Sequence, residues 1–142
     1  MAVSVIYHSR LPHIQKVADA IAKKCNVEAI DISEAHQFPE TDLLFLGIGI
    51  YKGKPDDALM DYLDQLPMNK IKGAALFSVS KSGNDHLEMV VNLLEHKGIV
   101  VYPEHFTCRR QHFIFAKGHP DARDVRRALR FTDRVLASFN KY

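Results

Sequence analysis

The sequence has few cysteines and no long apolar run, and each absence excludes a class of protein. Cys25 and Cys108 are its two cysteines and lie far apart, a pattern that supports neither a disulfide framework nor a zinc site. No segment approaches the roughly 20 consecutive apolar residues that a membrane-spanning helix needs. The N-terminus has no basic residue ahead of its short apolar run, so it does not resemble a signal peptide. We therefore expect a cytoplasmic protein without a bound metal.

The sequence also lacks a break in composition, an internal repeat and a low-complexity stretch. At 142 residues, with 46% hydrophobic and 25% charged side chains, its composition is that of an ordinary globular protein. This length fits one domain, so we expect residues 1–142 to fold as a single unit.

The net charge of +2 is small but unevenly distributed. Residues 1–99 carry 10 basic and 13 acidic side chains, whereas residues 100–142 carry 9 basic and 4 acidic ones. The basic excess falls on a predicted C-terminal helix, whose outer face holds Arg123, Arg126, Arg127, Arg130 and Arg134. Such a face can meet nucleic acid or an acidic partner. It has neither interleaved aromatic residues nor a recognition motif, which disfavours nucleic acid.

Apolar segments and helical stripes alternate along the chain. Five segments predict strands, at residues 2–7, 27–32, 43–50, 73–79 and 99–107. Residues 43–50 are apolar throughout, which is typical of a strand buried on both faces at the centre of a sheet. Four helical stripes begin near Pro12, Pro55, Leu87 and Pro120. The last strand continues past Pro103, which is tolerated at a sheet edge.

This alternation predicts parallel strands with right-handed crossovers. For five strands, the doubly wound solution is a three-layer α/β fold with strand order 2-1-3-4-5. The ligand crevice of such a sheet lies at the carboxyl ends of the strands, where the strand order reverses. Three loops meet there, at residues 8–13, 49–54 and 80–84. The first runs into a helix N-terminus, whose free N–H groups favour a phosphate.

Three stretches at these positions resemble the flavodoxin-like family. The family's phosphate loop and first helix are similar to residues 7–22, Y-H-S-R-L-P-H-I-Q-K-V-A-D-A-I-A. Its second flavin-contacting loop is similar to residues 47–63, G-I-G-I-Y-K-G-K-P-D-D-A-L-M-D-Y-L. F-T-C-R-R at 106–110 and G-H-P-D-A-R-D-V-R-R-A at 118–128 resemble the end of the same proteins. The resemblance covers nearly the whole chain and implies a flavodoxin-like fold, non-covalent FMN and electron transfer.

Carried over residue by residue, the resemblance implies a set of FMN-binding residues. The set is His8, Ser9, Arg10, Leu11, Pro12, His13, Ile14, Ile50, Tyr51, Lys52, Gly53, Ser80, Lys81, Ser82 and Gly83. Tyr51 is the candidate for stacking on the flavin ring, although an ordinary loop tyrosine is equally consistent with the sequence. Lys52, Lys54 and Lys81 are candidates for the crevice edge, where cations would favour the reduced anionic flavin.

The phosphate loop departs from the family pattern. Leu11 and Ile14 replace two threonines, and Pro12, which has no N–H group, replaces a glycine. Two lost hydroxyl groups would weaken FMN binding by about 3–6 kcal/mol. Ser9 and His13 retain polar chemistry there, and Arg10 is placed to bind the phosphate.

Two functions therefore stay open from the sequence. The first is an FMN-dependent electron carrier or small reductase with a redox partner protein, acting as a monomer or homodimer. The alternative is a degenerate flavodoxin-fold module that no longer binds FMN and acts in binding or regulation. A response-regulator receiver is excluded, because Tyr51 rather than an aspartate follows the third strand. Neither a cysteine-phosphatase spacing nor a G-x-S-x-G elbow is present.

Overall fold

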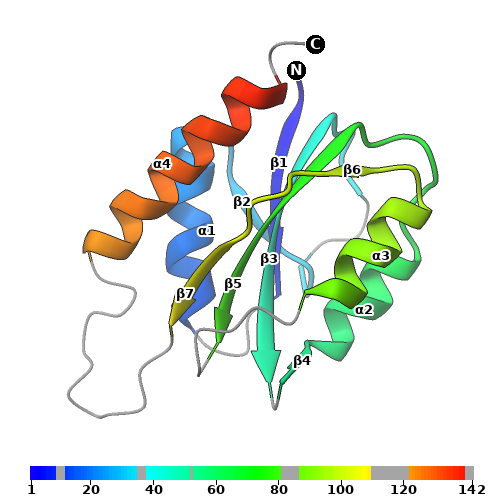
Figure 1. Ribbon diagram of the computed structural model, residues 1–142, viewed down its shortest axis with the longest axis horizontal. Helices are drawn as coiled ribbons and strands as arrows, with labels where there is room; N and C mark the ends of the chain where they lie inside the picture. Colours follow the sequence, from blue (N-terminus) through cyan, green and yellow to red (C-terminus); the bar gives the residue numbers. More distant parts are fainter. Residues whose placement is uncertain (9–11, 35–37, 52, 81–86, 110–121, 140–142) are drawn as a thin grey trace.

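The computed structural model describes residues 1–8, 12–34, 38–51, 53–80, 87–109 and 122–139. The strands are β1 (Val3–Tyr7), β2 (Ala29–Asp31), β3 (Leu43–Tyr51), β4 (Lys54–Pro55), β5 (Gly73–Ser80), β6 (Val100–Val101) and β7 (Phe106–Arg109). The helices are α1 (Pro12–Lys24), α2 (Asp57–Asp64), α3 (Glu88–His96) and α4 (Ala122–Phe139). Helices α1 and α4 cover one face of the central sheet, and α2 and α3 cover the other (Figure 1).

The sheet confirms the predicted flavodoxin-like fold and strand order. Its order is β2-β1-β3-β5-β6, with β7 also paired to β5, and all of these pairings are parallel. β5 therefore takes the fourth position of the predicted sheet, and β6 and β7 together take the fifth. The short β4 turns back antiparallel to the end of β3.

The fifth strand position differs from the prediction in one respect. We expected one continuous strand over residues 99–107, but it is interrupted between β6 and β7, around Pro103. Proline has no N–H group for the ladder, which explains a break at this residue. Tyr102 still donates its backbone N–H to Ala74 O at 2.8 Å, so the interrupted segment stays against the sheet.

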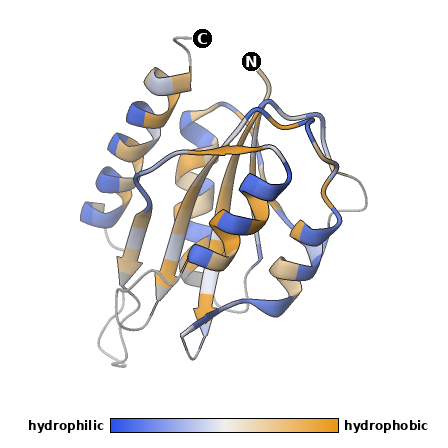
Figure 2. Cartoon of the chain, turned by 45° about the vertical axis from the view of Figure 1, so that its right-hand side comes forward, coloured by the Kyte–Doolittle hydropathy of each residue, from blue (hydrophilic) through white to orange (hydrophobic). Residues whose placement is uncertain are grey.

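Apolar side chains fill both spaces between the sheet and the helices. The central strands are accordingly the most hydrophobic segments in Figure 2. Alternate residues of β3 point to opposite faces, so Phe45 packs toward α1 and α4 while Leu46 packs toward α2 and α3. The ring of Phe131 in α4 is also fully buried, although it stands in a segment rich in arginine. It lies 6.4 Å from the ring of Phe45 in an edge-to-face arrangement. Within the residues described, none of the helices has both the length and the apolar character needed to cross a bilayer.

Candidate functional site

The sequence predicts the crevice at the carboxyl edge of the sheet, which is the edge at which β1, β3 and β5 end (Figure 1). Of the predicted site residues, Ser9, Arg10, Leu11, Lys52, Lys81, Ser82 and Gly83 lie outside the described residues. The backbone of Pro12, His13 and Ser80 is described, and so are the side chains of His8, Ile14, Ile50 and Tyr51. β1 and β3 are neighbours in the sheet, and β1 ends opposite Gly47, four residues before the end of β3.

Helix α1 begins at Pro12, the position that the sequence predicted. A helix leaves its first N–H groups without internal partners, so the amides that follow Pro12 are directed toward this edge. Ile14 does not point into the crevice, because its side chain is 3% exposed and packs in the core with Val17 and Ala18. The side chain of Ile14 therefore does not lie between the main chain of the first turn and the crevice.

A side-chain pair joins the end of β1 to the start of α2. The imidazole Nδ1 of His8 contacts the carboxylate Oδ2 of Asp56. The Asp56 side chain is fully buried, and that of His8 is 18% exposed. His8 alternates with Tyr7 along the strand and so points to the α2 side of the sheet, where Asp56 lies.

Asp56 also holds the second loop in place. Its other carboxylate oxygen accepts a hydrogen bond from Ala58 N at 3.0 Å, which caps the N-terminus of α2. Its own backbone N–H donates to Gly49 O at 3.0 Å. One residue thus connects the end of β1, the end of β3 and the first turn of α2. The sequence predicts only that a helix begins near Pro55, since no sequence pattern indicates a partner for Asp56 that lies 48 positions away.

Tyr51 ends β3 and folds back over Gly49. A Cβ atom added at Gly49 would lie 2.8 Å from Tyr51 Cε2, so the glycine leaves the space that the ring occupies. The ring is partly exposed and lies on the α1 side of the sheet, because residues 47, 49 and 51 share one face. The neighbouring Ile50 instead packs in the core on the α2 side. Tyr51 is therefore the aromatic side chain of β3 at this edge.

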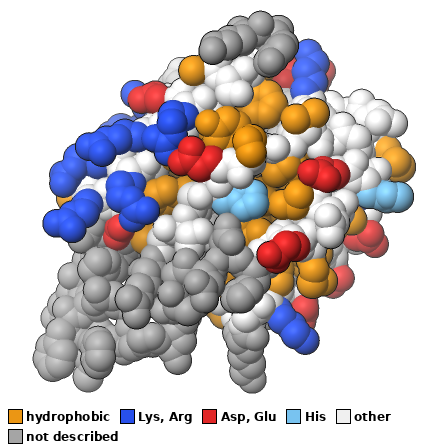
Figure 3. Space-filling view, viewed as in Figure 1, with side chains coloured by type: hydrophobic (Ala, Val, Ile, Leu, Met, Phe, Trp, Pro, Cys, Tyr) orange, Lys and Arg blue, Asp and Glu red, His pale blue; other side chains and the backbone are white. Residues whose placement is uncertain are grey.

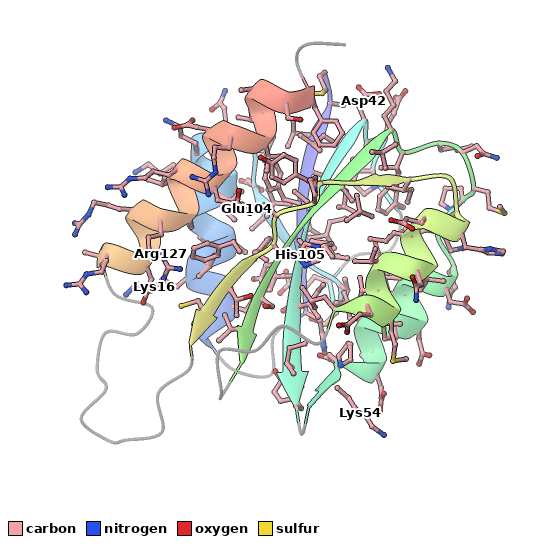
Figure 4. The ribbon with its side chains drawn as sticks, in the orientation of Figure 1. Lys16, Asp42, Lys54, Glu104, His105 and Arg127 are labelled. Atoms are coloured by element: carbon pink, nitrogen blue, oxygen red, sulfur yellow. The ribbon has the colours of Figure 1, made fainter. Side chains whose placement is uncertain are left out.

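The β3–β4 connection is a tight hairpin in which Tyr51 pairs with Lys54. Gly53 has φ +76°, a left-handed conformation that glycine adopts without strain. Lys54 is exposed at the tip and points away from the sheet (Figure 4). The paired residues Tyr51 and Lys54 thus flank the turn of the predicted second loop.

Two further side chains at this edge are buried. Burial raises the pKa of the Tyr7 phenol, and the carboxylates of Asp31, Asp19 and Glu34 raise it further. The phenol accordingly stays neutral at physiological pH. Cys108 of β7 is fully buried beside Val79 of β5, which is the environment of a structural thiol.

These residues fit a bound FMN in two respects. The main-chain amides at the start of α1 and the positive end of its dipole suit a phosphate group. The ring of Tyr51 at the end of the adjacent strand suits a flat aromatic ring. Among the described groups at the start of α1, those that could hold a phosphate are main-chain amides.

Comparison with solved structures gives the same fold over nearly the whole chain. A flavodoxin from the domain Archaea aligns with a TM-score of 0.74 and 17% identity, covering 97% of this chain and 98% of that one. Oxidised flavodoxin 1 from Bacillus cereus aligns with a TM-score of 0.70 and 21% identity, over 92% and 94%. Rubredoxin oxygen:oxidoreductase from Desulfovibrio gigas aligns with a TM-score of 0.69 and 13% identity, over 96% of this chain but 36% of that chain.

Sequence comparison identifies the family. An uncharacterized protein of Methanocaldococcus jannaschii is 26% identical over 152 aligned positions, which cover 96% of this chain and 99% of that protein. The sequence profile of the flavodoxin domain matches residues 4–109, most of the chain and all of the strands. The chain belongs to the flavodoxin-domain family.

Proposed function

We propose that this chain binds FMN non-covalently in the crevice at the carboxyl edge of β1 and β3 and transfers electrons to and from a partner protein. The observation that carries the proposal is the start of α1. The helix begins at Pro12, and Ile14 packs inward, so backbone amides face the crevice. When bound, FMN supplies the redox chemistry, and the protein supplies binding, orientation and electrostatics.

The residues of this chain have distinct parts in the proposal. The first turn of α1 holds the phosphate through its amides and its dipole. Tyr51 covers one face of the ring and is itself positioned by Gly49. The His8–Asp56 pair positions the first loop against the second, since it joins β1 to the start of α2.

Titration of the flavin-free protein with FMN and with riboflavin tests the proposal. Flavin fluorescence and absorbance report binding, and riboflavin lacks the phosphate. A hydrogen bond to a charged group contributes about 1.5–3 kcal/mol, so FMN should bind at least about tenfold more tightly than riboflavin. Absence of binding by either flavin would contradict the proposal, and equal affinities would contradict the phosphate site at α1.

Substitution of Tyr51 tests the ring contact separately. Tyr51→Ser should weaken binding of both flavins by about two- to tenfold, because aromatic pairs contribute about 0.5–1.5 kcal/mol. Tyr51→Phe keeps the aromatic face and should retain the wild-type affinity. If both variants bind FMN equally well, Tyr51 is not the stacking residue.

The second candidate function is a module that keeps the fold without flavin. The observation that favours it is the phosphate loop, where Leu11 and Pro12 replace the family's threonine and glycine. A Leu11→Thr/Pro12→Gly variant restores both positions and leaves the buried Ile14 unchanged. If wild type binds no flavin and this variant does, loop divergence accounts for the loss. If neither protein binds flavin, residues elsewhere in the crevice account for the loss of binding.

A further inference from the structure

The outer face of α4 is the most basic surface among the described residues. The helix carries five arginines against two aspartates, a net charge of +3, and the arginines are all exposed. They gather in one row over α4 (Figure 3). From Arg123 to Arg134 the row extends about 16 Å along the helix axis, at 1.5 Å per residue.

Most of this charge is not neutralised within the molecule. Arg134 pairs with Glu104, with Nη2–Oε1 at 2.5 Å, and Arg127 pairs with Asp124, with Nη1–Oδ1 at 3.5 Å (Figure 4 labels Arg127 and Glu104). Within the described part of the chain, Arg123, Arg126 and Arg130 contact no carboxylate. These three side chains are available for an external anion.

The two helical layers of the molecule have opposite charge. Helices α1 and α4 together carry +5, since α1 adds three lysines and one aspartate. Helices α2 and α3 together carry −5, from Asp57, Asp61, Asp64, Glu88 and Glu95. A negatively charged partner is attracted to the α4 side and repelled from the other, so this separation of charge orients its approach.

We propose that the outer face of α4 docks an acidic protein surface through Arg123, Arg126 and Arg130. A membrane surface fits less well, because the centre of the apolar face of α4, with Ala128, Phe131 and Val135, is buried against the sheet. Nucleic acid also fits less well, because Asp133 of α4 and Glu104, the partner of Arg134, are exposed carboxylates that repel phosphate. Protein interfaces, in contrast, are enriched in arginine.

The position of this face relates it to the crevice. The strands are parallel and α4 follows β7, so α4 begins at the carboxyl edge of the sheet, where the crevice lies (Figure 1). A partner on Arg123 and Arg126 would therefore lie beside the candidate flavin site. That this partner exchanges electrons rests on the proposed function, whereas the docking itself needs no flavin.

Fluorescence anisotropy with a labelled 20-residue poly-L-glutamate, measured on flavin-free protein, tests the docking. The test variant is Arg126→Glu/Arg130→Glu, and the charge-matched control is Lys70→Glu/Lys72→Glu, which reverses two exposed lysines at the amino edge. Wild type should bind the peptide at low salt and lose it as salt is added. The arginine variant should bind at least about tenfold more weakly, because like charges repel, while the control stays within about twofold of wild type.

Three results would overturn the proposal. The first is no salt-sensitive binding by wild type, and the second is an equal loss in both variants. The third is tighter binding, at 0.15 M salt, of a labelled DNA duplex or of phosphatidylserine vesicles than of poly-L-glutamate. Sedimentation of the protein alone adds one more decisive outcome: if wild type self-associates and the arginine variant does not, the occupant is a second copy of this chain. Because no flavin is present, a failure here is distinct from a failure of the FMN titration.

Discussion

The helical layers on the two faces of the sheet differ in charge and in how their helices are joined. The α1/α4 layer carries +5, and its interhelical ion pair, Lys24–Asp133, is exposed, with Nζ–Oδ1 at 3.5 Å. The α2/α3 layer carries −5 and is joined by a buried lysine. Lys97 Nζ donates to Asp64 O and Leu66 O, both at 2.8 Å. The polar contacts that join the helices are thus buried in the α2/α3 layer and exposed in the α1/α4 layer.

The charged groups of the two layers therefore have different roles, since those of the α2/α3 layer hold a helix in place and those of the α1/α4 layer remain at the surface. In the α2/α3 layer, Asp56 caps the first turn of α2 and Lys97 binds the carbonyls at its end, so both termini of this short helix are fixed by buried charged groups. In the α1/α4 layer, apolar packing around Phe131 and Val135 holds the helices, and their charges remain at the surface. Surface charge there can serve a partner without affecting the core.

Removal of the Asp56 carboxylate should have the largest effect on stability. Asp56→Ala deletes the α2 cap and leaves His8 without its partner, which should lower the free energy of unfolding by about 2–4 kcal/mol. Asp56→Asn is the matched control, since asparagine caps helices as well as aspartate. Urea unfolding measures both. Wild-type stability of the alanine variant would show that the buried anchor has no part in holding this layer.

Lys97→Met should have the next largest effect on the free energy of unfolding. It keeps most of the side-chain volume but leaves two carbonyl groups of the α2 end without a donor, at a cost of about 1–3 kcal/mol. Lys72→Met, at an exposed lysine 4.0 Å from Asp42, is the control and should change stability by less than about 0.5 kcal/mol. If the two variants are equally stable, the layers do not differ as described.

Tyr62→Phe should stabilise the α2/α3 layer. The Tyr62 hydroxyl is buried and has no hydrogen-bond partner among the described residues. Removing it should raise the free energy of unfolding by about 1 kcal/mol or more. A Tyr62→Leu variant controls for loss of the ring against Phe38 and should be less stable than Tyr62→Phe. A destabilised phenylalanine variant would indicate a partner for the hydroxyl.

The same residue predicts a pH dependence. Burial raises the pKa of Tyr62 above 10.0, so the folded chain keeps this proton at a pH where the unfolded chain loses it. Stability is therefore full below pH 10 and falls as pH rises through the folded value. Tyr62→Phe should reduce this alkaline slope, with Tyr7 retaining part of it. Urea midpoints between neutral pH and the alkaline range measure the slope, and parallel curves would refute the assignment.

The smallest effect is expected in the basic layer. Lys24→Ala and Asp133→Ala should each change stability by less than about 1 kcal/mol, because exposed ion pairs contribute little. A double-mutant cycle measures their coupling, which should disappear at high salt. A coupling as large as the effect of Lys97→Met would remove the contrast between the layers.

The sequence predicted the sheet because the apolar pattern is strong where strands are buried on both faces. Residues 43–50 form the central strand as expected, residues 73–79 form the buried strand beside it, and Pro12 begins α1. The break near Pro103 was not predicted, because a proline at a sheet edge is compatible with a continuous strand as well. Phe131 was missed, since it lies between Arg130 and Thr132 in a segment dominated by arginines.

The candidate site was only partly predictable for a different reason. The position of the crevice follows from topology, and Tyr51 and His8 follow from adjacent loops. The role of Asp56 depends on a contact across 48 residues, which no local spacing encodes. The inward packing of Ile14, in contrast, agrees with its i, i+3, i+4 spacing with Val17 and Ala18.

Amide chemical shifts of the ¹⁵N-labelled protein during FMN titration test the central claim most directly. Binding of the phosphate by the first turn of α1 predicts that the amides of His13 and Ile14 move most, and that riboflavin moves them much less. The amides of Lys72 and Gly73, at the opposite edge of the sheet, should not move. Shifts confined to that opposite edge, or no shift at α1 with saturating FMN, would contradict the account.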